Sequence, residues 1–402
     1  MANLKKLAEE INKKSKIPAN PAEAKPKDKP ESKYTSADYM KILSALGYRF
    51  RLCTLDDRVE VNGEPITDSR ISEINSKVRD LGLNRVQVLA DHYTRHAAEN
   101  SYHPIKDYFN SLTWDKRDHI LKLSKFFSDT DNIFGIVLKR WLIGAVSKAF
   151  TASQNPMLVL NSQKQGIGKS TFSSWLCSFQ PGRFIESSID PSNKENEIRL
   201  MSLFIWEVSE LGATTRKADM EALKAFITRQ QVTVRMPYGH FDIVKPALAS
   251  MIGTINDIGG FLNDPSGTRR FMTVNLTAID HAYQKDIDIN QVWAQAYALY
   301  KRGDSPRPTK EEQEKIFSIN ERFEVENPLV DLLKKNFKIS PGNQEYSLAT
   351  TEIIKTLRND GWKGAPNETA EAMLISRAAA KLNLQRRLNP TRGWTGITYK
   401  KP

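Results

Sequence analysis

The sequence predicts an α/β fold with a small additional domain on either side of its central part. A strand-length apolar run at residues 157–160 leads through a polar loop into the start of a helix at residue 172, which is the element order of a parallel sheet. Residues 34–103 mix helical patterns with alternating ones in a short globular segment. Residues 327–402 carry three helical patterns and then a strand, an order typical of a winged-helix-like domain.

The loop after the apolar run has the layout of a phosphate-binding loop. Its glycines let backbone N–H groups approach phosphate oxygens, its lysine meets the β- and γ-phosphates, and its serine can bind Mg²⁺. The first glycine position of the G-x-x-x-x-G-K-[ST] pattern is held by Gln163, so the prediction depends on the strand before the loop and the helix after it. The residues expected to bind ATP with Mg²⁺ are Gln165, Gly166, Ile167, Gly168, Lys169, Ser170 and Thr171.

An NTPase of this type also needs carboxylates opposite the loop, to hold Mg²⁺ and to polarise the attacking water. Residues 202–211 form an apolar run of strand length that contains Glu207 and Glu210 near its end. A buried strand that brings acids to its carboxyl end, beside the phosphate loop, is the expected geometry of an open α/β sheet. These glutamates are the candidate catalytic acids, although without the loop an edge strand with surface acids would explain them.

Two further patterns would complete such a site. Asn256 follows the strand pattern at residues 247–255, where its amide can position the lytic water. Arg269 and Arg270 lie together on a turn, and an arginine acting in trans stabilises charge on a transferred phosphoryl group. A turn-forming asparagine and a surface basic pair are the simpler readings of each pattern alone.

Residues 231–246 predict a β-hairpin between the acids and Asn256. Alternating valines lead to a turn at residues 238–239, and apolar residues continue on the return. Basic and aromatic side chains on a projecting hairpin suit a nucleic-acid single strand, which offers phosphates and stackable bases. The candidate DNA-binding residues are Arg235, Tyr238, His240 and Lys245, with an ordinary surface hairpin as the alternative.

Composition favours a polyanionic partner and a cytoplasmic location. The 402 residues carry a net charge of +12, which fits nucleic acid better than charge kept for solubility. Cys53 and Cys177 are the only cysteines, so a disulfide framework and a cysteine-rich zinc site are excluded. No apolar run is long enough to span a membrane, and the first residues lack the apolar core of a signal peptide.

The first 103 residues divide into two parts. Residues 1–33 are rich in Lys, Glu, Pro and Ala and are expected to form a flexible basic arm. Residues 34–103 are expected to form the small N-terminal α/β domain, whose chemistry the sequence does not reveal. His92 and His96 share a helix face there, but no third ligand is fixed by spacing, so a metal site is not expected.

After the central segment, residues 306–402 are expected to form a linker helix and the winged-helix-like domain. The stretch 303–308 reads as a linker because of its Gly, Ser and Pro content. A basic tail without acids favours nucleic-acid contact, with a solvated face as the alternative. Its basic residues are Lys381, Arg386, Arg387, Arg392, Lys400 and Lys401.

Taken in order, these blocks resemble the virulence-associated E (VirE) family of phage- and plasmid-type AAA+ proteins, which is related to superfamily 3 helicases. The resemblance covers residues 103–276, somewhat under half the chain. The matching blocks are residues 103–108 with Trp114 and Asp115, then 139–146, 165–171, 207–211, 224–228, 237–239, 253–256 and 264–271.

The resemblance implies an AAA+ ATPase core at residues 104–305 that assembles as a hexameric ring, with ATP at the subunit interfaces. The hairpin would line a central channel and grip DNA. The implied roles are Walker A for Lys169 and Ser170, Walker B for Glu207 and Glu210, sensor 1 for Asn256 and arginine finger for Arg269 or Arg270. The E-x-x-E spacing leaves open which acid holds the metal; we favour Glu207 for the metal and Glu210 for water activation.

The predicted function is an ATP-driven DNA helicase or replication initiator of a mobile genetic element. A DNA-binding or loading ATPase without unwinding activity is the first alternative. A small-molecule kinase is the alternative from another class, but it leaves the hairpin and the basic tail unexplained. Single-stranded DNA in the channel and duplex origin DNA on the C-terminal domain are the expected ligands, and a primase or a polymerase would be a natural partner.

Overall fold

The computed structural model describes residues 35–81, 86–189, 193, 195–209, 211, 217–235, 241–256, 269–323, 328–388 and 391–400. The chain divides into two compact units, which are described separately below. The first contains residues up to 258 together with 266–321, and the second contains the last part of the chain from residue 322.

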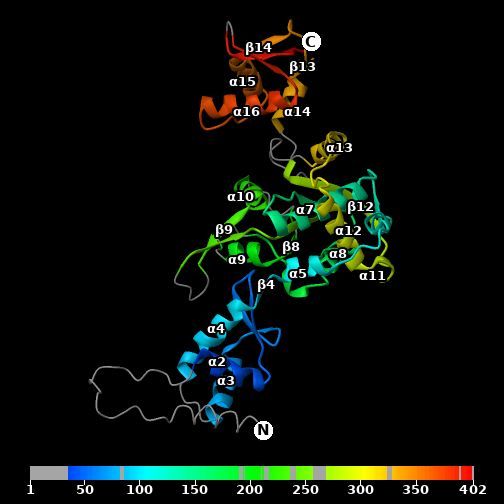
Figure 1. Ribbon diagram of the computed structural model, residues 1–402. Helices are drawn as coiled ribbons and strands as arrows, with labels where there is room; N and C mark the ends of the chain where they lie inside the picture. Colours follow the sequence, from blue (N-terminus) through cyan, green and yellow to red (C-terminus); the bar gives the residue numbers. More distant parts are fainter. Residues whose placement is uncertain are drawn as a thin grey trace, which may run out of the picture. The chain divides into compact units, whose positions relative to one another are not determined.

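The N-terminal part of the first unit is a four-stranded sheet with helices packed on it (Figure 1). Strand order is β3-β2-β1-β4, and the turn between β2 and β3 has positive φ at Asn62 and Gly63, as a tight hairpin requires. A cluster that includes Leu43, Phe50 and Leu89 forms its core. Its elements are α2 (Ser36–Ala45), β1 (Phe50–Cys53), β2 (Arg58–Val61), β3 (Glu64–Pro65), α3 (Asp68–Asp80), the 3-10 helix η1 (Val86–Val88), α4 (Leu89–Glu99) and β4 (Ser101–Tyr102).

A six-stranded sheet forms the centre of the first unit. Its order is β5-β12-β6-β11-β8-β7, and all neighbours are parallel except β5 and β12. The first parallel strand, β6, therefore lies between two strands that come later in the chain. Its carboxyl end is at the position where open α/β sheets bind their ligands. The strands are β5 (Phe127–Asp129), β6 (Met157–Asn161), β7 (Phe184–Glu186), β8 (Ile205–Val208), β11 (Ser250–Ile255) and β12 (Phe271–Ile279).

Helices cover this sheet, and its inner strands are therefore buried along most of their length. Helix α7 packs against α12 and β6, while α8 contacts β7, β8 and β11 (Figure 1). The helices are α5 (Pro104–Ser111), α6 (His119–Ser124), α7 (Phe134–Thr151), α8 (Lys169–Leu176), η2 (Pro181–Arg183), α9 (Glu195–Ser202), α10 (Lys217–Thr228), α11 (Tyr283–Asp286), α12 (Ile289–Arg302) and α13 (Lys310–Glu321).

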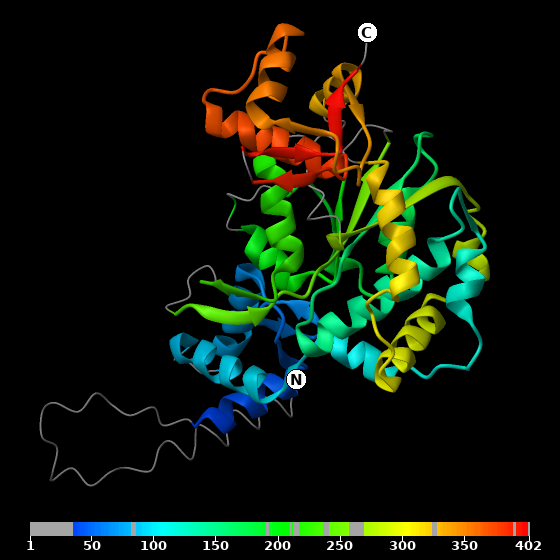
Figure 2. The same ribbon diagram turned by 90° about the horizontal axis from the view of Figure 1, so that it is seen from above.

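The predicted hairpin is present as β9 (Gln231–Val234) and β10 (Ile243–Pro246), which pair antiparallel. In Figure 2 these strands, drawn in yellow-green, extend away from the central sheet. The tip, with Tyr238 and His240, lies outside the described residues.

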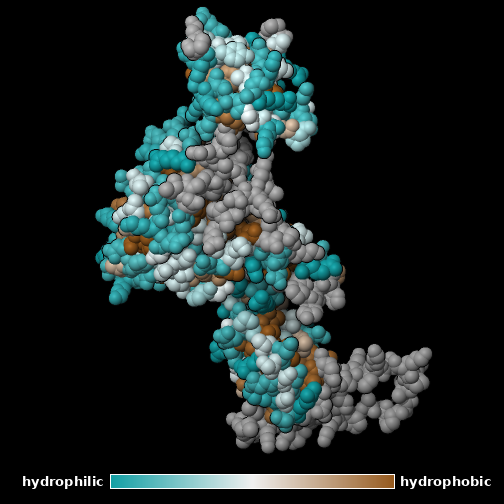
Figure 3. Space-filling view, turned by 180° about the vertical axis from the view of Figure 1, so that it is seen from behind, coloured by the Kyte–Doolittle hydropathy of each residue, from teal (hydrophilic) through white to brown (hydrophobic). Residues whose placement is uncertain are grey.

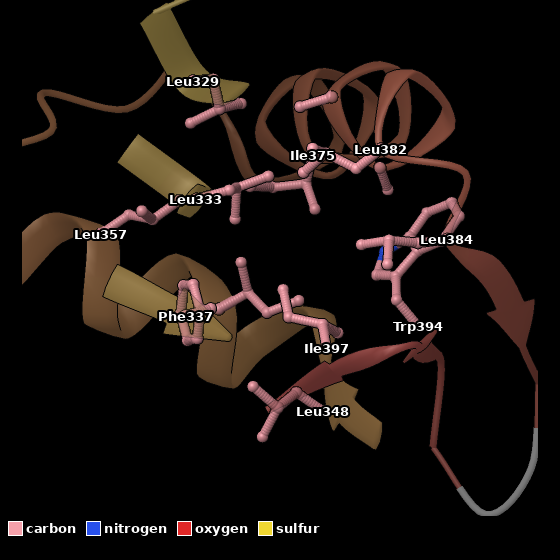
Figure 4. Close-up of a cluster of buried hydrophobic side chains, with 13 residues drawn as sticks. Leu329, Leu333, Phe337, Leu348, Leu357, Ile375, Leu382, Leu384, Trp394 and Ile397 are labelled. Carbon is pink, nitrogen blue, oxygen red and sulfur yellow. The ribbon is translucent and has the colours of Figure 1, made fainter. Parts of the chain in front are cut away.

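The second unit packs three helices against short antiparallel strands. Figure 4 shows Leu333, Ile375, Trp394 and Ile397 pointing into one shared core. The strand predicted after the three helical patterns is interrupted at Gly396, which has a φ of +85°. The elements are α14 (Pro328–Asn336), β13 (Phe337–Ile339), β14 (Ser347–Ala349), α15 (Thr350–Asn359), α16 (Glu368–Lys381), β15 (Gln385–Arg387), β16 (Gly393–Thr395) and β17 (Ile397–Tyr399).

Figure 3 shows one face of the molecule, coloured by the hydropathy of each residue. In the view of Figure 3, hydrophilic residues predominate and hydrophobic ones form separate patches. None of the helices built from described residues has the length and apolar character needed to cross a membrane.

Candidate functional site

A pocket of about 390 Å³ lies at the carboxyl ends of the parallel strands in the central sheet. The loop between β6 and α8 and the first turn of α8 form one wall, and residues at or just beyond the carboxyl ends of β7, β8 and β11 form the other. Its lining residues are Gly166, Ile167, Gly168, Lys169, Ser170, Thr171, Glu186, Ser209, Thr254 and Asn256. Six of the seven predicted nucleotide-binding residues are among them, and Gln165 precedes them in the chain.

The loop backbone turns as the glycines allow. Gly166 and Gly168 have φ of +71° and +95°, a region that residues with a side chain rarely adopt. A side chain at Gly168 would also collide with the imidazole of His281. Gly168 is the N-cap of α8 and provides no side-chain cap, so the first backbone N–H groups of the helix are available to an anion.

Lys169 reaches across the pocket to the next parallel strand. Its Nζ donates a hydrogen bond to Oδ1 of Asn256, at 2.6 Å. Only 7% of Lys169 is exposed, and this burial lowers the pKa of its ammonium, while the charge of Glu207 acts in the opposite direction. The predicted cation and the predicted amide therefore face the same space.

Glu207 lies beneath the start of α8 and is fully buried. Its Oε1 accepts hydrogen bonds from the hydroxyls of Ser170, at 2.6 Å, and Thr254, at 3.1 Å. Burial raises the pKa of this carboxyl, the Ser170 hydrogen bond lowers it, and the nearby charge of Glu186 raises it further.

The second oxygen of Glu207, Oε2, is buried and has no hydrogen-bond partner among the described residues. A carboxylate oxygen beside a serine hydroxyl is the donor set that Mg²⁺ prefers. Ser170 and Glu207 thus fit the metal that the sequence predicts.

Glu186, the last residue of β7, is a pocket residue that the sequence reasoning missed. A signal was present: Phe184, Ile185 and Glu186 repeat the apolar-apolar-acid order of residues 205–207. Glu210, the second predicted acid, lies outside the described residues.

The two predicted arginines do not line this pocket. They precede β12, whose first residue Phe271 is in register with Met157, the first residue of β6. The phosphate loop follows the carboxyl end of β6. The five residues of β6, about 15 Å of strand, therefore separate the arginine end of the sheet from the phosphate loop. Arg269 is exposed; Arg270 is half-buried, and its Nε has no hydrogen-bond partner within the described ranges.

Two of the predicted DNA-binding residues are described. Arg235 forms an ion pair with Asp242 across the hairpin, at 2.9 Å, with both side chains mostly exposed. Lys245 instead contacts the N-terminal part: its Nζ lies 2.7 Å from Oδ1 of Asp57 and 2.9 Å from the carbonyl oxygen of Thr54.

Of the predicted basic tail, Arg386, Arg392 and Lys400 are exposed, whereas Lys381 and Arg387 are half-buried. Lys401 lies outside the described residues. In the N-terminal part, His92 stacks on Tyr39 with ring centroids 4.9 Å apart. Within the described ranges, no cluster of three or more His, Cys, Asp or Glu side chains could hold a metal.

Comparisons with known proteins gave a family match and similar solved structures. The virulence-associated protein E-like domain matches residues 109–325, which is more than half of the 402 residues. The apo structure of the NrS-1 C-terminal region aligns with a TM-score of 0.52 and 11% identity, over 90% of this chain and 98% of that one. Its A-form apo structure aligns with a TM-score of 0.46 and 11% identity, over 90% and 99%. At this identity the likeness concerns the fold alone. The comparison with curated proteins found no match.

Proposed function

The chain belongs to the virulence-associated protein E-like domain family, and from that premise we propose that it is an ATP-driven DNA helicase or replication initiator of a mobile genetic element. One observation carries the ATPase part of the proposal. Lys169 and Ser170 of the loop contact Asn256 and Glu207 in one pocket, although these residues come from three separate strands or loops of the sheet.

Each of these residues has a role in the proposed hydrolysis. The backbone N–H groups at the start of α8 and the ammonium of Lys169 hold the phosphates, and Asn256 orients the attacking water. Ser170 and Glu207 would hold Mg²⁺, which neutralises charge on the phosphates when bound. Glu210 takes the proton of the water in this proposal.

The proposed architecture is an AAA+ core with a winged-helix-like domain after it. The central strand order, with the first parallel strand next to the last, supports the first part. The combination of three helices with two small antiparallel sheets, β13-β17 and β14-β16-β15, in the second unit supports the other. We propose a hexameric ring in which Arg269 or Arg270 serves the ATP site of the neighbouring subunit. Both precede the amino end of β12, whereas their own phosphate loop follows the carboxyl end of the neighbouring parallel strand β6.

The test is ATP hydrolysis and strand displacement with and without single-stranded DNA. DNA-stimulated ATPase with displacement supports the helicase; stimulation without displacement indicates a loading ATPase. Absence of any response to DNA favours a small-molecule kinase.

Point variants test the ATPase site itself. Lys169→Ala should lose nucleotide binding or turnover, whereas Glu210→Gln should bind ATP and hydrolyse it slowly. Turnover by Glu210→Gln at the wild-type rate would show that another group activates the water.

A further inference from the structure

We propose that Glu186 is the second carboxylate of the Mg²⁺–nucleotide site and strengthens the coupling between Mg²⁺ and ATP binding. The inference rests on the proposed ATPase function. It assigns to β7 a part of the site that the sequence motifs do not contain.

The strand register places Glu186 opposite the buried acid. β7 and β8 are parallel, and Glu186 is in register with Glu207. Register partners on neighbouring strands carry their side chains on the same face, so both carboxylates belong to the face that α8 covers.

The end of β7 is held firmly in this position. The backbone N–H of Ser187 donates to the carbonyl oxygen of Glu207, at 3.0 Å. The indole Nε1 of Trp206 donates to the carbonyl oxygen of Ser187, also at 3.0 Å. Two hydrogen bonds therefore fix the backbone immediately after Glu186, which a precise binding geometry requires.

Strand β8 cannot supply a second acid to this face by itself. Val208 follows Glu207 and is 3% exposed, and successive residues of a strand point to opposite faces. Among the described residues that line the pocket, Glu186 is the one carboxylate.

Charge explains why a divalent cation fits here. Glu186 lines the pocket, and Glu207 is buried beside it under the hydroxyl of Ser170. The ammonium of Lys169, which also lines the pocket, donates to Asn256. Glu207 keeps one buried oxygen without a partner in the described part of the chain. Bringing the phosphates of ATP into this space adds like charge, which a cation coordinated by oxygen ligands or their bound waters relieves.

The experiment measures binding of a fluorescent ATP analogue at several Mg²⁺ concentrations, with no turnover required. The ratio of its affinities with and without Mg²⁺ is the coupling factor. Glu186→Gln should reduce this factor about tenfold relative to the wild type, and should leave Mg²⁺-free affinity unchanged or tighter because repulsion is removed. Glu186→Asp should restore part of the factor. The matched control is Glu64→Gln, an exposed glutamate on β3.

An unchanged coupling factor in Glu186→Gln overturns the proposal, and so does an equal loss of affinity with and without Mg²⁺, which marks a structural role. A wild-type protein that binds no nucleotide overturns the proposed function together with this inference. Wild-type binding with unchanged coupling overturns the inference alone.

Discussion

Lys148 carries an ionisable group at a buried position. It lies on α7 with 1% of its surface exposed, and its Nζ donates to the carbonyl oxygen of Ala249, at 2.6 Å. Burial lowers the pKa of this ammonium from 10.5 to about 7. The hydrogen bond ties α7 to the start of β11, the strand that ends before Asn256.

This pKa gives a testable pH dependence. Between pH 7 and 10.5 the unfolded chain keeps the proton and the folded chain has lost it, so the Lys148 contribution to the free energy of unfolding rises with pH. Lys148→Met should lower the slope of the free energy of unfolding against pH by up to about 1.4 kcal/mol per pH unit, the value for one proton. The measurement is urea unfolding from pH 7 to pH 9. Lys139→Met, a half-buried lysine on the same helix, is the control. Parallel wild-type and Lys148→Met curves would contradict the assignment.

Some residues in the blocks that resemble the VirE family serve the fold. His103 accepts a hydrogen bond from the backbone N–H of Lys106 and caps α5, with Pro104 at the first helical position. Burial and the charge of Lys106 lower the pKa of His103 to about 4. Arg140 pairs with Glu312 and so ties α7 to α13. The blocks that resemble the VirE family therefore contain residues that stabilise the fold as well as residues of the candidate site.

At the level of elements, the β9–β10 hairpin is joined to the N-terminal sheet. Lys245 on β10 contacts Asp57 in the turn between β1 and β2. In the same turn, the buried Asp56 forms an ion pair with Arg183, which immediately precedes β7. One turn of the N-terminal part therefore contacts both the proposed DNA hairpin and the residue that precedes β7, the strand that ends in Glu186.

Three variants separate the grip on DNA from this anchoring contact. Arg235→Ala should lower the slope of log affinity against log salt by about one unit, because one phosphate contact is lost. It should leave amide hydrogen exchange in β10 unchanged, since its exposed pair with Asp242 adds little stability. Asp57→Asn should raise that exchange without changing the salt slope; asparagine is chosen because Asp57 has a φ of +49°.

Lys245→Ala should both lower the salt slope of DNA affinity and raise amide hydrogen exchange in β10. Basal ATPase activity should survive in all three variants. A Lys245→Ala protein with the wild-type salt slope would mean that this lysine only anchors the hairpin. DNA contact would then be sought on the exposed basic residues of the second unit, Arg386, Arg392 and Lys400.

At the level of the whole molecule, the positions of the arginines bear on assembly. Arg269 and Arg270 precede the amino end of β12, and the phosphate loop follows the carboxyl end of β6. Because β12 and β6 run parallel, the amino end of one and the carboxyl end of the other lie at opposite ends of the strands. An arginine there can serve an ATP site only if that site belongs to another copy of the chain.

Mixing experiments test this arrangement. Arg270→Ala and Lys169→Ala should each be inactive alone, and a mixture should regain part of the ATPase activity, because some interfaces then pair an intact loop with an intact arginine. Specific activity of the wild type should also rise with protein concentration. Activity independent of concentration, without rescue in the mixture, would argue for a site completed within one chain. The same mixture with Arg269→Ala identifies which arginine acts.

The sequence by itself determined the parts of the site that are local in the chain. Strand β6, the glycines with positive φ and the start of α8 follow one another within about twenty residues, so their pattern could be read directly. The apolar run that contains Glu207 could also be read, because a buried parallel strand is largely hydrophobic. The hairpin strands were found for the same local reason, from their alternation.

Only the tertiary structure decided which distant residues meet. Glu186 enters the pocket because β7 pairs with β8, and a three-residue strand gives too short a pattern to predict its neighbour. Lys245 meets Asp57 across 188 residues of chain, and nothing in either local pattern specifies the other. The parallel pairing of β12 with β6 places the paired arginines at the amino ends of the strands, away from the loop at their carboxyl ends. Strand order and domain contacts depend on the packing of whole faces, so a local pattern can identify a side chain's chemistry but not its partners.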